Sequence, residues 1–212
     1  VCSGSFKKGN KVFHTRTNKE MKIASPVFFQ AQDREIVEEA VPGDIIGIHD
    51  NGKFQIGDTF TQGSKIKFSG IPNFAPEIFR TVILKDPLKS KQLTKGLEQL
   101  SEEGTVQLFK KKTTNEKILG AVGVLQFEVV QFRLENEYSV KAIYEGHHFI
   151  GIRWLKFKNE KSKNDFIDNY APVIAYDHKN RVCFGVKSAW DLKLAIEKNP
   201  DVDFYVNSDY VK

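Results

Sequence analysis

The spacing of hydrophobic and polar residues changes partway along the chain. Over residues 11–70 it consists of short extended runs separated by turns: KVFHTRT, KIASPVFFQA, REIVEEA, DIIGIHD, KFQIGDTF and KIKFSG. A Pro42–Gly43–Asp44 turn and the pair Asn51–Gly52 predict a hairpin over residues 41–63. Several short strands at close spacing predict a small antiparallel β-barrel or sandwich.

A pattern of alternating strands and helices begins after the segment GIPNFAP (residues 70–76). We take this segment as a linker, because its two prolines and its glycine interrupt the β pattern. A strand over 79–85 leads to a helix between Pro87 and Gly104. Strands over 105–112 and 117–122, a second helix and a strand over 140–146 follow. The second helix is marked by Leu125, Val129, Phe132 and Leu134 or Tyr138. The order β-α-β-β-α-β is that of the ferredoxin-like split βαβ.

The remaining chain is patterned as an α/β extension. It predicts a strand over 149–157, a helix over 160–169, a hairpin over 172–186, a helix over 188–198 and a strand over 202–206. The pattern leaves open whether the extension continues the preceding domain or is a small appendix to it. We therefore expect domains at 1–72 and 73–212, the second comprising a split βαβ at about 78–147 and an extension at 148–212. The fold class is β followed by α+β.

Composition narrows the function only slightly. A hydrophobic share of 40% and a charged share of 28% are typical of a soluble globular protein. The net charge of +5 favours an anionic partner such as nucleic acid without demanding one. Cys2 and Cys183 have no C-x-x-C partner, so a disulfide framework or zinc site has no support and a cytoplasmic setting is expected. No apolar run reaches the roughly 20 residues of a membrane span, so we expect no membrane partner.

The search for catalytic chemistry gives few candidates. There is no G-x-x-x-x-G-K-[ST] motif, and the run at Asn18 to Met21 lacks the aspartate of a guanine-reading N-K-x-D. We predict no catalytic, nucleotide-binding or metal residues and no cofactor in this chain. His147 and His148 are adjacent, so in a strand their side chains would point to opposite faces and would not share one metal. An enzyme site around these two or around Asp177 and His178 stays open as an alternative, whereas Cys183 in VCFGV is expected to be a buried apolar residue.

Basic residues offer candidate contacts to phosphates. Lys110, Lys111 and Lys112, with Lys117 across the turn, gather at the tip of a predicted hairpin, where Glu116 offsets one charge. A second basic turn contains Lys7, Lys8 and Lys11 around Gly9. The lysines of both turns could equally be solvated and contact no partner. The segment GAVG (residues 120–123) is a weak signal for phosphate binding, and close packing of a strand against a helix explains its small residues as well.

Three strings resemble a known family. FFQAQDREIVEEAVPGDIIGIHDNGKFQIGDTFTQG (residues 28–63) is similar to domain II of the translational GTPases. KFSGIPNFAPEIFRTVILKDPLKSKQLTKGLEQLSEEGTVQLFKK and GAVGVLQFEVVQFRLENEY resemble the family of bacterial peptide chain release factor three, the class II termination factors. Elongation factor G usually reads G-x-G-E-L-H at the second helix, where this chain has Val124, Leu125, Gln126 and Phe127 after Gly123.

This resemblance implies a three-domain protein composed of a GTP-binding domain, a barrel and the α+β domain. Such a factor uses GTP and GDP with magnesium, binds the ribosome after peptide release and promotes departure of the codon-reading release factor. Because the chain starts without methionine inside the barrel pattern, we expect a fragment without the GTP-binding domain and without one or more N-terminal barrel strands.

The resemblance also implies partners and leaves alternatives. We expect a monomer that contacts small-subunit ribosomal RNA and ribosomal protein, its own GTP-binding domain and, indirectly, codon-reading release factors. The lysines named above would supply ribosome or RNA contacts. The alternatives are a stand-alone RNA-binding protein and the accessory domains of another translational GTPase such as elongation factor G.

Overall fold

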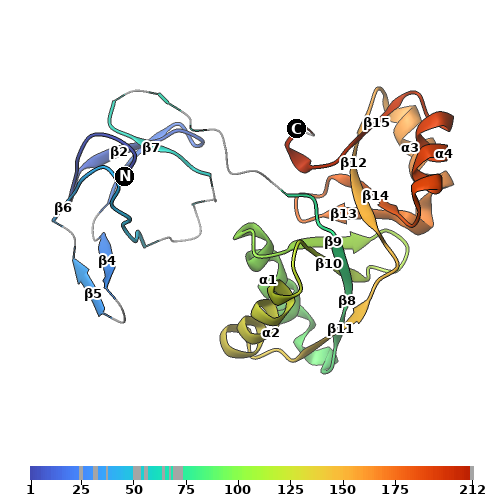
Figure 1. Cartoon of the computed structure of the whole chain (residues 1–212), viewed down its shortest axis with the longest axis horizontal. Coiled ribbons are helices and arrows are strands. Elements are labelled where there is room, and N and C mark those ends of the chain that lie inside the picture. Colours follow the sequence, from blue (N-terminus) through green and yellow to red (C-terminus); the bar gives the residue numbers. More distant parts are fainter. Residues whose placement is uncertain are drawn as a thin grey trace. The chain divides into compact units, whose positions relative to one another are not determined.

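The computed structural model describes residues 1–23, 26–30, 33–36, 38–49, 54, 57–63, 65, 66, 68 and 74–210. The chain forms two compact units, Val1–Ile71 and Pro72–Lys212 (Figure 1). The hairpin turn expected at Asn51 and Gly52 and the first part of the expected linker, residues 70–73, lie outside the described residues.

The first unit is made of short antiparallel strand pairs. Its strands are β1 (Phe6–Lys7), β2 (Lys11–His14), β3 (Lys19–Lys22), β4 (Val27–Gln30), β5 (Asp33–Ile36), β6 (Glu39–Ala40) and β7 (Phe60–Thr61). They pair as β3-β2-β7, β1-β6 and β4-β5 around a small core of Phe6, Val12, Ile23 and Ala40. The β class predicted for this region is confirmed.

Two of the predicted runs differ in detail. KIASPVFFQA is divided between β3 and β4, and Pro26 between them has no N–H for a ladder bond. In the described part of DIIGIHD, the sheet pairing consists of a single bridge from Gly47 to Val27.

The second unit begins with the split βαβ that the spacing predicted. Its elements are β8 (Ile78–Leu84), a 3-10 turn (Pro87–Lys89), α1 (Ser90–Glu102), β9 (Gln107–Lys111), β10 (Lys117–Ala121), α2 (Leu125–Tyr138) and β11 (Ala142–Gly146). The strands lie in the order β11-β8-β10-β9, and all pairs are antiparallel. Gly104, with φ of 76°, follows the end of α1 as the expected stop signal.

The extension continues the same sheet. It contains β12 (Gly151–Phe157), α3 (Glu160–Asn169), a 3-10 turn (Ala171–Val173), β13 (Ile174–Asp177), β14 (Val182–Val186), α4 (Ala189–Lys198), β15 (Val202–Tyr205) and a last 3-10 turn (Ser208–Tyr210). β13 pairs with β9, which places Ala175 opposite Lys111 and Asp177 opposite Phe109. The result within residues 74–210 is one eight-stranded sheet in the order β11-β8-β10-β9-β13-β14-β12-β15. The extension is therefore not an appendix.

Alternating side chains divide the interior of this unit into three clusters. One lies under α1 and α2 and includes Leu97, Leu108 and Leu134. Another lies under α3 and α4. The third lies on the opposite face of the sheet and joins the two halves, since Phe109 and Trp154 rings are 5.8 Å apart between centroids. This shared cluster holds the split βαβ and the extension together as one body.

Candidate functional site

The lysine-rich turn lies between β9 and β10. The backbone N–H of Asn115 donates to the carbonyl oxygen of Lys111 at 3.0 Å, and the N–H of Lys111 donates to Glu116 at 2.9 Å. Asn115 has φ of 54°, a left-handed conformation that asparagine tolerates and that closes the turn. Lys110 and Lys117 face each other directly across the ladder.

Carboxylates from two helices and from the turn itself accompany these lysines. The ammonium of Lys110 lies 2.7 Å from Glu98 in α1, and that of Lys112 lies 3.1 Å from Asp168 in α3. Lys111 lies 3.7 Å from Glu116. The expectation that Glu116 alone offsets the charge of this turn is therefore wrong, because the helices bring two further acids from distant parts of the chain.

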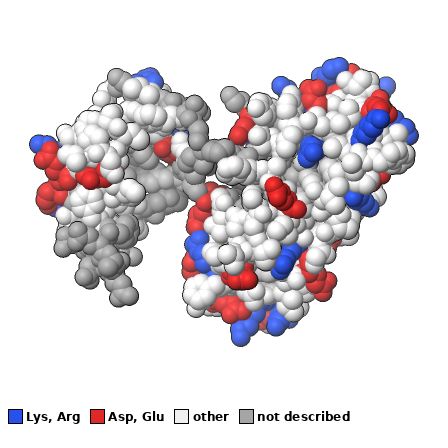
Figure 2. All heavy atoms as spheres, viewed as in Figure 1, with Lys and Arg blue, Asp and Glu red and all other residues white. Residues whose placement is uncertain are grey.

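The lysines also point in different directions. Strand alternation sends Lys110 toward α1 and Lys111 toward the other face of the sheet, while Lys112 reaches α3. Burial and the nearby charge of Lys110 lower the pKa of Lys117. The four lysines surround the turn and do not form one continuous patch. Charges of both signs are also interspersed on the visible face of the second unit in Figure 2.

The basic turn of the first unit has a similar arrangement. Gly9, with φ of 81°, allows the tight turn between β1 and β2. Lys7 lies 3.6 Å from Glu39 and Lys8 lies 2.8 Å from Glu38. Lys11 is exposed at the start of β2. Exposed pairs of this kind contribute about 0–1 kcal/mol each, so these lysines can exchange a carboxylate for a phosphate at small cost.

The GAVG segment forms the junction between β10 and α2. The side-chain oxygen of Gln126 accepts the backbone N–H groups of Val122 and Gly123 at 2.8 and 2.9 Å, and its amide donates to the carbonyl of Thr105 at 2.8 Å. A Cβ on Gly120 would lie 2.8 Å from Pro76, so this glycine permits close packing. The two N–H groups that a phosphate would use are already satisfied, which favours the packing interpretation.

His147 and His148 lie in the connection between β11 and β12. Their rings stack with centroids 4.2 Å apart, so the expectation that they point to opposite faces is wrong, because strand alternation does not apply to a connection. The Nδ1 of His147 accepts the N–H of Phe149 at 3.2 Å. Burial and His148 lower the pKa of His147 to about 4, and burial with Lys187 lowers that of His148. Both rings are therefore neutral at pH 7.

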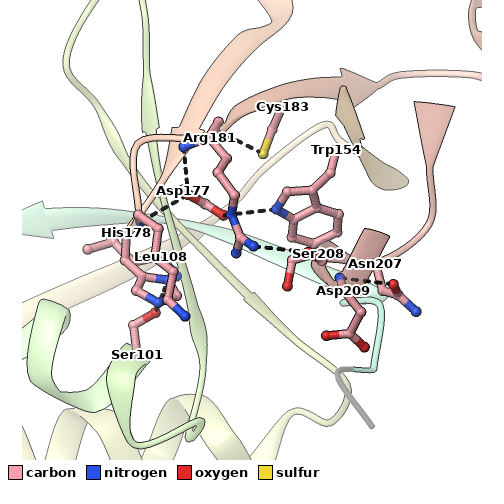
Figure 3. Close-up of polar contacts among 11 residues, drawn as sticks. Ser101, Leu108, Trp154, Asp177, His178, Arg181, Cys183, Asn207, Ser208 and Asp209 are labelled. Carbon is pink, nitrogen blue, oxygen red and sulfur yellow. Dashed lines mark hydrogen bonds and ion pairs between the residues drawn. The ribbon is translucent and has the colours of Figure 1, made fainter. Parts of the chain in front are cut away.

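A buried carboxylate organises the turn between β13 and β14 (Figure 3). One oxygen of Asp177 accepts the backbone N–H groups of Lys179 and Arg181 at 2.9 Å. The other accepts Trp154 Nε1 at 2.9 Å and Arg181 Nε at 2.7 Å. The guanidinium of Arg181 also donates to the carbonyl of Ser208 at 3.0 Å. The network fixes the predicted turn and attaches the segment after β15 to the sheet.

The same network gives no support to nucleophilic catalysis. The ring Nδ1 of His178 lies 3.3 Å from the hydroxyl of Ser101, which accepts the N–H of Leu108 at 3.2 Å. A Ser-His-Asp triad needs a carboxylate that orients the histidine, but both oxygens of Asp177 already receive other donors. Cys183 is fully buried as predicted, and burial raises the pKa of its thiol. These residues have the contacts of a structural network.

Among the residues that the structure describes, no group of three or more histidine, cysteine, aspartate or glutamate side chains is placed to hold a metal ion. None of the helices in that part of the chain has the length and apolar character needed to cross a membrane.

A known protein family matches most of the second unit. The family model described as "Class II release factor RF3, C-terminal domain" matches residues 68–196, more than half of the sequence. The chain belongs to the family of class II release factor RF3 C-terminal domains. This match confirms the resemblance inferred from the strings around the linker and α2.

The first unit matches a different family from the second unit. A second family model, elongation factor G domain 2, matches residues 1–63. Both matched families are accessory domains of translation factors, so the chain has a role related to translational GTPases.

A solved structure has a fold similar to that of most of this chain. A crystal structure of a protein from Thermus thermophilus is similar over 74% of this chain, with a TM-score of 0.58 and 20% identity. The chain covers 24% of that longer protein. At this identity the likeness concerns the fold alone.

One surface of the RF3 domain was missed by sequence reasoning. Leu125, Val129 and Phe132, used to mark the second helix, are exposed, whereas Phe127, Val130 and Leu134 face the core. The signal was present in LQFEVVQF, which contains more apolar residues than one helical face can hold.

Proposed function

We propose that this chain is the ribosome-binding accessory part of a translational GTPase that acts in termination and promotes departure of codon-reading release factors after peptide release. The observation that carries the proposal is the RF3 match over residues 68–196. It is supported by the split βαβ and its extension, which form one sheet and so act as a single body.

The two units would contact different parts of the ribosome. The first would contact small-subunit ribosomal RNA, and the second would contact ribosomal protein, with the release factor affected indirectly. GTP or GDP with magnesium would be bound by a separate GTP-binding domain. A rigid second unit is suited to report the nucleotide state by changing its orientation as one body.

The lysine turns would supply electrostatic contacts. Lys110, Lys111 and Lys112, with Lys117, surround one turn, and Lys7, Lys8 and Lys11 surround another. Their carboxylate partners are held by weak surface pairs, so ribosomal phosphates can compete for the ammonium groups. The chain would bind as a monomer.

Deletion tests the role of the second unit. A full-length parent protein lacking residues 78–212 should lose acceleration of release-factor departure from ribosomes after peptide release. The measurement is the rate at which a labelled codon-reading release factor leaves a termination complex. A deleted parent that remains as active as the intact protein would refute the role given to this unit.

Charge removal tests the lysine turn. The triple change Lys110→Ala, Lys111→Ala and Lys112→Ala should weaken sedimentation of the chain with ribosomes and lower the salt slope of binding by up to about three. The matched control removes three charges elsewhere, at Lys158, Lys161 and Lys163 of the α3 region. A slope that the first triple leaves unchanged would mean that the turn is merely solvated. Equal binding to a free RNA hairpin would instead indicate a stand-alone RNA-binding protein.

A further inference from the structure

Helix α2 carries two opposite apolar faces. Phe127, Val130 and Leu134 are buried against α1 and the sheet. Leu125, Val129 and Phe132, at positions i, i+4 and i+7, form the second face and are 71%, 48% and 69% exposed. The packing of the second unit therefore explains only one of the two faces.

Two further exposed apolar residues lie at the junction just before α2. Val122 and Val124 are 45% and 47% exposed. Gln126 fixes this junction through its bonds to Val122, Gly123 and Thr105, so the valines are held in place beside the helix. We call the five residues Val122, Val124, Leu125, Val129 and Phe132 the outer face of α2. Contiguous exposed apolar patches commonly mark sites of interaction with other proteins.

The rim of the outer face is acidic. Glu128 and Glu135 are exposed along one side of α2. On the other side, Arg133 forms ion pairs with Glu137 and with Glu103, just after α1. Arg133 is therefore outnumbered by four glutamates, and its own charge is already paired.

The apolar outer face and its acidic rim together favour one class of partner. Phosphate groups would be repelled by the acidic rim, and RNA offers no large aliphatic surface for the valines, leucine and phenylalanine. A protein surface with lysine or arginine side chains around apolar ones matches both the charge and the apolar area.

We propose that the outer face of α2 docks such a basic, apolar protein surface on the small ribosomal subunit. The inference rests on the proposed ribosome-binding function and assigns its protein contact to one face. It assigns the lysine turn between β9 and β10 a different task, since that turn is suited to phosphate.

The test uses the chain of residues 1–212 and three targets: small ribosomal subunits, the proteins extracted from them, and protein-free small-subunit RNA. The double change Val129→Ser and Phe132→Ser removes apolar contact. Glu128→Lys with Glu135→Lys reverses the rim. Trp190→Ser is the matched control, because Trp190 is 67% exposed on α4, away from this face. The altered side chains are largely exposed, and an unchanged melting temperature would verify that each variant is folded.

Both α2 variants should bind subunits and extracted proteins at least about tenfold more weakly than the unaltered chain, as expected when central apolar anchors are lost. Trp190→Ser should bind normally, and binding to protein-free RNA should be unaffected by the α2 changes. Normal binding of the α2 variants to subunits would refute the docking inference alone. A loss confined to RNA would also refute it and identify RNA as the occupant. If the unaltered chain binds none of the three targets, the proposed function and the inference both fall.

Discussion

The ring of Phe149 occupies the space where a side chain at position 185 would begin. A Cβ built on Gly185 would lie 2.0 Å from the ring Cζ and 2.3 and 2.4 Å from its two Cε atoms. Phe149 is 4% exposed and packs against Phe79 with centroids 6.2 Å apart. Gly185→Ala is thus expected to force the ring out of the cluster that joins the two halves of the sheet.

The size of the effect follows from packing. Overpacking a closed core usually costs about 1–3 kcal/mol, and we expect about 3 kcal/mol here because the overlap is with ring carbons that have little room to move. Phe149→Ala alone should cost about 3–5 kcal/mol by leaving a cavity. In that variant, the added methyl group at Gly185 finds open space, so Gly185→Ala should cost less than about 1 kcal/mol. The two changes should therefore be coupled by about 2 kcal/mol or more.

Urea unfolding measures these values. In a Trp190→Phe background, fluorescence reports Trp154, which belongs to the same cluster as Phe149. Gly146→Ala is the control, since a Cβ there meets nothing within 4 Å. A free energy of unfolding lowered by less than about 0.5 kcal/mol in Gly185→Ala, or additive effects of the two changes, would refute the steric argument.

Three further predictions concern two buried groups, Asp177 and Cys183, and the half-buried ring of His147. Asp177→Ala should lower the free energy of unfolding by about 3–5 kcal/mol, because it leaves the Arg181 guanidinium without its buried partner, and a urea midpoint close to that of the unaltered chain would contradict this. Cys183 should stay unreactive toward a thiol reagent in the folded protein while exposed Cys2 reacts, and fast modification of both before denaturation would count against the described burial. The pKa of His147 is lowered to about 4 in the folded state, so the stability that the neutral ring contributes above about pH 6.5 should be lost as the pH falls from 6.5 toward 4. Urea midpoints measured across this pH range test the prediction. If a His147→Gln variant has the same pH profile of urea midpoints, the loss belongs to other groups.

Local patterns predicted the elements of the second unit well. The leucines of α1 recur at helical spacing, and Ser188, at the start of the helix predicted over 188–198, caps α4 by accepting the N–H of Asp191 at 3.0 Å. These signals lie within a few residues of one another, so the sequence alone contains them. The same pattern showed that Cys183 is a small apolar residue in a strand, and its burial is confirmed.

Local patterns did not predict the contacts between residues that are far apart in the chain. The lysine turn has carboxylate partners at Glu98 and Asp168 because helices α1 and α3 bring them there. His147 and His148 stack in a connection that leads directly to Phe149, whose ring fills the space beside Gly185. A periodic pattern records which residues share a face, but it does not record which elements approach that face.

The order of strands and helices and the strings shared with the release-factor family can be seen in the sequence alone. The pairing of β9 with β13, which turns the split βαβ and the extension into one sheet, appears only in the folded protein. Packing in the folded protein likewise sets which face of α2 is buried and which is left exposed. The physical reason is that strand pairing and burial are contacts between segments far apart in the chain, whereas periodicity is a property of neighbours.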